Sequence, residues 1–162
     1  MRILGIDPGL NVTGIGVVEV EDDHCIHLHH SVLRTRPSDP LSARLVLLRD
    51  GVRDAAKHWL VSAGAVESSF VANNARSALL LGHARAAAIV GLADAGVPVF
   101  EYAPNLVKQT VAGYGHGEKS QVAMMVKLQL GLKTTPTPAD AADALAIALT
   151  HWAHSRIQLL VR

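Results

Sequence analysis

Four carboxylates occur in sequence settings that suit a metal site. Asp7 follows the apolar run at residues 3–6, and Glu67 follows another at residues 63–66. Asp140 and Asp143 lie three residues apart in an alanine-rich segment, a spacing that places both side chains on one face of a helix. Carboxylates without a cluster of Cys or His suit hard cations such as Mg²⁺ or Mn²⁺. The sequence therefore predicts a divalent-metal site built from distant parts of the chain.

Each part of this set also has a structural explanation. Asp7 begins an Asp-Pro-Gly turn, and Asp140 and Asp143 suit the first turns of a helix through its dipole. The other residues around Asp140 and Asp143 are mostly alanine and leucine, which indicates a largely buried helix and disfavours a solvent-exposed pair of acids without a function. Two hard cations about 4 Å apart can activate water and stabilise the leaving oxygen in phosphoryl displacement, which is the chemistry of nucleases.

Length and composition set the wider limits. The chain has 162 residues, of which 49% are apolar, so we expect one folded domain over residues 1–162. No uninterrupted apolar run approaches the roughly 20 residues that span a bilayer, and the N-terminus does not resemble a signal peptide. A single cysteine, Cys25, suits the cytoplasm. The net charge of +1 neither indicates nor excludes a nucleic-acid partner. If metal ions neutralise the four acids, the rest of the protein is more basic than this total suggests.

Hydrophobic periodicity predicts an α/β protein with a mixed five-stranded sheet. The order is three antiparallel N-terminal strands, a helix, a strand, a long helix, a strand and further helices. The predicted strands cover residues 2–6, 13–20, 25–35, 63–66 and 98–102. The predicted helices cover about 41–59, 74–95, 105–112, 120–130 and 139–155. In the third strand, alternation places His27 and His29 on one half-exposed face.

Five segments in the same order resemble the RuvC family of bacterial Holliday junction resolvases. They are residues 3–9 (ILGIDPG), 75–85 (ARSALLLGHAR), 107–111 (VKQTV), 117–122 (GEKSQV) and 139–148 (ADAADALAIA). The resemblance extends from about residue 2 to residue 156. It implies an RNase H-like fold with helices on both faces of the sheet, and a homodimer that binds a four-way DNA junction. It also implies paired symmetric nicks that leave 5′-phosphates during recombination and repair, and cooperation with the RuvA–RuvB branch-migration complex.

The resemblance also assigns roles to residues. By position, Asp7, Glu67, Asp140 and Asp143 match the catalytic metal-binding acids, which would hold two Mg²⁺ or Mn²⁺ ions per active site. Phe70 matches an aromatic that stacks on a junction base, Lys108 and Lys119 match basic residues near the cut phosphate, and Arg76 is a weaker candidate for DNA-backbone contact. The chain departs from many relatives at Ser68 and Ser69, which follow Glu67. Some relatives carry His in place of the last acid, so Asp143 is the most replaceable ligand.

Three other functions compete with this interpretation. The Gly-Ile-Asp-Pro-Gly segment resembles the first phosphate loop of sugar-kinase-like ATPases, but a second such loop is missing from the sequence and the chain is short for that class. An RNase H-like nuclease acting on structured RNA would use the same acids and metals. A module that only binds junctions would not need all four acids.

Overall fold

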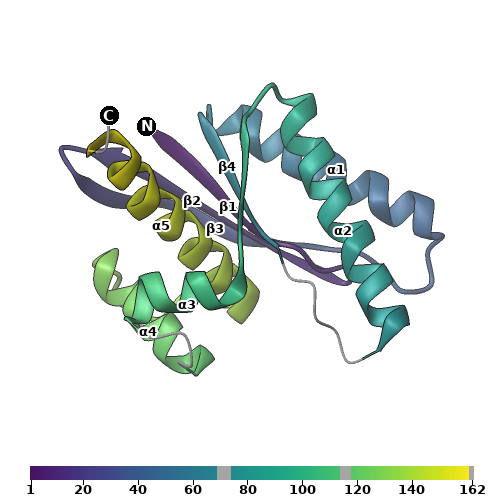
Figure 1. Cartoon of the computed structure of the whole chain (residues 1–162). Coiled ribbons are helices and arrows are strands. Elements are labelled where there is room, and N and C mark those ends of the chain that lie inside the picture. The colour runs from purple at the N-terminus through teal and green to yellow at the C-terminus, as the bar shows by residue number, and fades with distance from the viewer. Residues whose placement is uncertain (69–73, 114–117, 161–162) are drawn as a thin grey trace.

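The chain forms a five-stranded sheet with helices packed on both faces (Figure 1). The computed structural model describes residues 1–68, 74–113 and 118–160, and side chains as far as residue 156. The strands are β1 (Arg2–Asp7), β2 (Val12–Glu21), β3 (His24–Arg34), β4 (Ala63–Glu67) and β5 (Val99–Tyr102). The helices are α1 (Leu41–His58), α2 (Ala75–Asp94), α3 (Pro104–Ala112), α4 (Lys119–Gln129) and α5 (Ala139–Leu160).

The sheet is mixed, and its strand order is β3-β2-β1-β4-β5. Strand β2 runs antiparallel to both β1 and β3, whereas β4 is parallel to β1 and β5 is parallel to β4. The β2–β3 connection turns at Asp22 and Asp23, whose φ values of 45° and 66° match a two-residue hairpin turn with the twist of the sheet. The predicted arrangement of three antiparallel strands followed by two further strands is confirmed.

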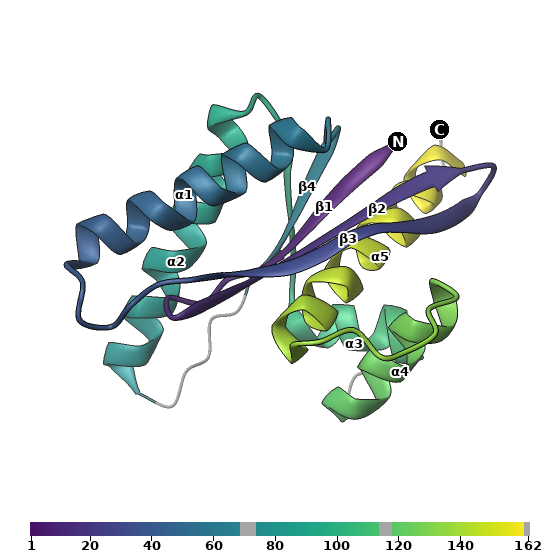
Figure 2. The ribbon, with the colours of Figure 1, turned by 180° about the vertical axis from the view of Figure 1, so that it is seen from behind.

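The helices form two layers around the sheet. Helices α1 and α2 cover one face, and α3, α4 and α5 cover the other (Figures 1 and 2). Because side chains alternate along β1, Leu4 and Ile6 pack in the cluster with α1 and α2, whereas Ile3 packs in the cluster with α5. The continuous apolar run of β1 is thus explained by burial on both faces.

Helix α5 packs directly against β1 and β2 because these strands carry glycine at the contact. A Cβ atom at Gly5 would overlap the carbonyl oxygen of Ala144, and one at Gly16 would lie 2.7 Å from the backbone nitrogen of Leu145. Such short separations leave no room for a side chain, so the helix backbone rests on the strand backbone. This close packing fixes the height of α5 above the sheet.

Helix α2 has an apolar composition but only one side in the core. By length and composition alone it could cross a membrane, although Arg76, Arg85 and Asp94 interrupt its apolar sequence. Its inner residues, including Ala88 and Leu92, pack against α1 and the sheet as in an ordinary protein core. The remaining apolar residues of α2 face outward.

Two details differ from the sequence-based predictions. Helix α5 extends to Leu160, five residues beyond the predicted end. A bulge in the β2–β3 pairing, opposite Val17 and Val18, also breaks the alternation of β3. As a result His27 contacts His30, with 2.8 Å between Nε2 and Nδ1, whereas His29 stacks on Trp59, so the predicted shared face of His27 and His29 is wrong.

Candidate active site

Two of the predicted acids lie side by side at the ends of neighbouring parallel strands. The register of β1 and β4 pairs Ile6 with Val66, so the following residues, Asp7 and Glu67, end the two strands together. Strand alternation directs both side chains to the face that α5 covers, the same face as Gly5 and Ala65. The parallel pairing therefore joins two acids that are sixty residues apart in sequence.

The other two acids lie at the start of α5, above the same strand ends. Gly14 pairs with Asp7 across β1 and β2, and a Cβ at Gly14 would overlap the backbone carbonyl of Asp140. Asp143 follows three residues later, on the same side of the helix, and is about one-fifth exposed. The close packing of α5 on the sheet thus places its first turns beside Asp7.

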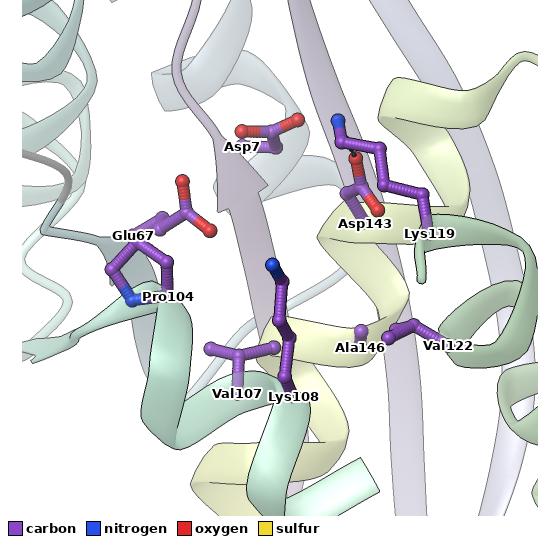
Figure 3. A pocket seen from close by; sticks show the side chains of 9 residues that line it. All are labelled: Asp7, Glu67, Pro104, Val107, Lys108, Lys119, Val122, Asp143 and Ala146. Atoms are coloured by element: carbon purple, nitrogen blue, oxygen red, sulfur yellow. Dashed lines mark hydrogen bonds and ion pairs between the residues drawn. The ribbon is translucent and has the colours of Figure 1, made fainter. Parts of the chain in front are cut away.

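A cavity of about 180 Å³ opens between these elements. Figure 3 shows the carboxylates of Asp7, Glu67 and Asp143 around it, with the ammonium groups of Lys108 and Lys119 nearby. The apolar part of the wall consists of Pro104, Val107, Val122 and Ala146. The cavity therefore combines a group of acids with two basic side chains and one apolar wall.

The crowding of acids changes the ionisation of Asp7. Burial, as the largest cause, and the negative charges of Glu67, Asp143 and Asp140 together raise the pKa of Asp7 from 3.8 to about 8, against the opposing charge of Lys119. Burial also raises the pKa of Glu67, as does the charge of Asp143, while Lys119 and Lys108 lower it. The acids thus oppose one another's ionisation when no metal cation is bound.

Lys119 forms an ion pair with Asp143, with 3.0 Å between Nζ and Oδ2 (Figure 3). This hydrogen bond and the charge of Asp143 raise the pKa of Lys119, as do the charges of Asp7 and Asp140. The lysine side chain is 77% exposed, so a long and mobile stem carries the ammonium group to a carboxylate of the pocket.

The residues of the cavity fit a hard cation by their chemistry. Carboxylate oxygens are the ligands that Mg²⁺ and Mn²⁺ prefer, and the carboxylates of Asp7, Glu67 and Asp143 line one cavity. Within the described ranges, no three His, Cys, Asp or Glu side chains are already arranged closely enough to hold a metal ion. The present geometry therefore gathers the acids without closing a complete ligand set.

The structure places some of the sequence-predicted residues at the cavity and others away from it. Asp7, Glu67, Asp143, Lys108 and Lys119 all line the cavity. Asp140 is close enough to influence Asp7 electrostatically but does not line it. Arg76 is exposed in the first turn of α2 and does not line it either. Phe70 lies outside the described residues.

Sequence reasoning missed the apolar wall of the cavity and the ion pair between Lys119 and Asp143. Val107 directly precedes Lys108, and Val122 lies one helical turn after Lys119. The three-residue spacing of Val122 from Lys119 could have marked Val122 as a neighbour of the site, whereas Val107 carries no such signal because adjacent helix residues do not share a face. The pairing of Lys119 with Asp143 depends on how α4 packs against α5, which no local pattern encodes.

Comparison with known proteins gives a consistent result. Residues 3–151 match the family model described as crossover junction endodeoxyribonuclease RuvC. The chain is 50% identical over 157 residues to the protein of that name from Maricaulis maris, covering 96% of this chain and 93% of the relative. It is 47% identical over 163 residues to that of Afipia carboxidovorans, covering 100% of this chain and 94% of the relative.

A solved structure is similarly close. The chain is similar to T. thermophilus RuvC in complex with Holliday junction substrate, with a TM-score of 0.92 and 41% identity over 98% of this chain and 96% of that one. This similarity confirms the predicted RNase H-like fold.

Proposed function

The chain belongs to the RuvC family of crossover junction endodeoxyribonucleases, and on this premise we propose that it is an endonuclease that resolves four-way DNA junctions in recombination and repair. The observation that carries the proposal is the similarity, over nearly the whole chain, to a relative solved with a Holliday junction substrate. The acidic cavity at the strand ends is the site of cleavage.

The reaction is hydrolysis of a phosphodiester. Water adds to phosphorus, the bond to the 3′ oxygen breaks, and the products are a 5′-phosphate and a 3′-hydroxyl. Asp7, Glu67, Asp140 and Asp143 would hold two hard cations, Mg²⁺ or Mn²⁺. When bound, such ions activate the attacking water and stabilise the leaving oxygen. The acids supply the negative charge that retains the ions, and the fold supplies their positions.

Lys108 and Lys119 hold the DNA strand at the cut. Both line the cavity, from α3 and α4 respectively, so their ammonium groups face a phosphate that enters between these helices (Figure 3). A phosphate here brings negative charge toward an acidic site, and the lysines offset the resulting repulsion. Arg76 contacts the DNA backbone farther from the cavity, and Phe70 stacks on a base at the branch point.

The active form is a homodimer, because two symmetric cuts need two sites. The outer side of α2 supports this assignment. Leu79 is 63% exposed and Val90 is 46% exposed on this helix, and an apolar groove between α1 and α2 includes Val46 and Val90. Exposed apolar residues on adjacent helices suit a self-complementary interface. The protein acts in the cytoplasm and cooperates there with the RuvA–RuvB branch-migration complex.

The test is incubation with a mobile four-way DNA junction and Mg²⁺ or Mn²⁺, followed by mapping of the nicks. We expect paired nicks at symmetric positions with 5′-phosphate ends, and no cutting in EDTA. A structured RNA of matched length is the control for an RNA-directed nuclease. Cutting of the RNA but not of the junction would contradict the proposal.

A further inference from the structure

The inference concerns what neutralises Asp143 before metal and DNA bind, and it rests on the proposed function. We infer that in the free protein the Lys119 ammonium group neutralises Asp143, as a metal ion would, and competes with divalent metal for this carboxylate. The free enzyme therefore holds metal weakly at this end of the cavity. A DNA phosphate that draws Lys119 away leaves Asp143 available to metal.

The first support is geometric. Lys119 Nζ lies 3.0 Å from Asp143 Oδ2, so the ammonium group occupies one lone pair of a carboxylate that a metal ion would bind. The Asp143 side chain is only one-fifth exposed, and Lys119 contacts one of its two carboxylate oxygens. A metal cation that binds Asp143 through this oxygen therefore meets the positive charge of Lys119 and competes with its hydrogen bond.

The second support is that Lys119 can leave without disturbing the fold. Its side chain is 77% exposed, and it stands at the first position of α4. That helix end is secured by Glu118 and Gln121 through a capping box that does not use the Lys119 side chain. Breaking the ion pair therefore costs little beyond the pair itself, as is usual for a largely exposed lysine.

The third support is the contrast with Lys108. It lines the same cavity and lowers the pKa of Glu67 through its charge, yet in the part of the chain that the structure describes it makes no ion pair with an acid. The two lysines thus carry the same charge at one site, but only Lys119 occupies a ligand atom. This difference separates direct competition from general electrostatic repulsion.

The competition makes metal and DNA binding cooperative. If DNA phosphate takes up the Lys119 ammonium, metal affinity rises on DNA binding, and by linkage metal raises DNA affinity equally. The complete metal set then forms mainly on a bound substrate.

The experiment is calorimetric titration of the DNA-free protein with Mn²⁺, comparing wild type with Lys119→Ala, Lys119→Met, Lys119→Arg and Lys108→Ala. We expect Lys119→Ala and Lys119→Met to bind Mn²⁺ at least about fivefold more tightly than wild type. Lys119→Arg retains the charge and should stay near the wild-type affinity. Lys108→Ala should tighten binding by clearly less than Lys119→Ala. Thermal unfolding verifies that each variant is folded.

Equal effects of Lys119→Ala and Lys108→Ala, or no effect of either, would overturn the competition while leaving the nuclease function intact. Failure of the nuclease proposal gives a different result, because junction cutting by the wild-type enzyme would then be absent whatever the Mn²⁺ affinities. Tighter Mn²⁺ binding by Lys119→Ala that persists in an Asp143→Asn background would also overturn the inference, since the competition acts through that carboxylate.

Discussion

The backbone carbonyl of Asp140 lies where a side chain on Gly14 would have to be. Gly14 is also the residue that pairs with Asp7 across β1 and β2. Position 14 therefore pairs with Asp7 and also sets how closely α5, which carries Asp140 and Asp143, approaches the sheet. The spacing of the acids is a consequence of backbone packing.

Gly14→Ala should therefore damage both stability and catalysis. The added methyl group must push the first turn of α5 away from β2, because the overlap is with backbone and cannot be relieved by a side-chain rotation. Overpacking of this kind costs about 1–3 kcal/mol of unfolding free energy. We expect a lower melting temperature and much slower junction cutting, measured by thermal unfolding and single-turnover cleavage. Unchanged cutting would show that α5 can shift without consequence.

Asp7→Asn and Asp140→Asn should abolish cutting of a four-way junction while leaving junction binding largely intact. Each change removes a charged oxygen ligand and keeps the shape of the side chain. Gel-shift binding in EDTA and cleavage in Mg²⁺ or Mn²⁺ separate the two effects. Asp39→Asn, at an exposed position before α1, is the matched control and should cut normally. Rapid cutting by either site variant would refute the metal role of that acid.

The raised pKa of Asp7 predicts a pH-dependent stability in the metal-free protein. The folded state binds this proton more tightly than the unfolded chain, in which the pKa is near 3.8. The protonated Asp7 carboxyl therefore contributes its full stabilisation of the folded state below about pH 4. This contribution declines as the pH rises and is lost once the pH passes about 8. Asp7→Asn carries no such proton, so between pH 5 and 9 in EDTA it should lose less stability than wild type.

Thermal unfolding at a series of pH values is the measurement. Around pH 9 the Asp7→Asn variant should melt several degrees above wild type, given about 2–4 °C for each kcal/mol in a domain of this size. Saturating Mn²⁺ should stabilise wild type strongly and the variant weakly. Parallel pH profiles for the two proteins in EDTA would contradict the ionisation described for Asp7.

Lys108→Ala and Lys119→Ala should each slow junction cutting and reduce its salt dependence. If each lysine neutralises one phosphate, its loss lowers the slope of log affinity against log salt concentration by about 1. Binding measured between roughly 50 and 200 mM salt gives that slope. Lys133→Ala changes an exposed lysine outside the cavity and serves as the control. A slope that does not differ from that of this control would exclude a phosphate contact.

Leu79→Glu should convert the proposed homodimer to monomers. Leu79 is 63% exposed on the outer side of α2, and a charge there would be buried without a partner in an apolar interface. Leu128→Glu is a matched control because Leu128 is 62% exposed but lies on α4, on the other face of the sheet (Figures 1 and 2). Sedimentation velocity should show a monomer only for the α2 variant. A dimer in both cases would place the interface elsewhere.

The sequence predicted the secondary structure well where periodicity is strong, and it predicted which acids meet where an acid directly follows a strand. Asp7 and Glu67 could be placed together because each ends an apolar run, and parallel strands bring their ends to one edge. The helical spacing of Asp140 and Asp143 was equally readable. The family resemblance identified the lysines.

Other features depend on tertiary packing and left little trace in the sequence. The bulge in β3 adds one residue to the strand and carries no Gly or Pro signal, so His27 and His29 were assigned to one face. Gly14 resembles any strand glycine until α5 is placed above it. The pairing of Lys119 with Asp143 joins two helices that approach each other only in the complete fold.

The order in which the acids occur along the chain has a consequence during protein synthesis. Asp7 and Glu67 leave the ribosome early, but Asp140 and Asp143 belong to α5, which is made after all five strands of the sheet. A nascent polypeptide therefore cannot bring the four acids together until α5 has emerged and packed on the strands. A chain whose translation stops before residue 140 lacks two of the four acids.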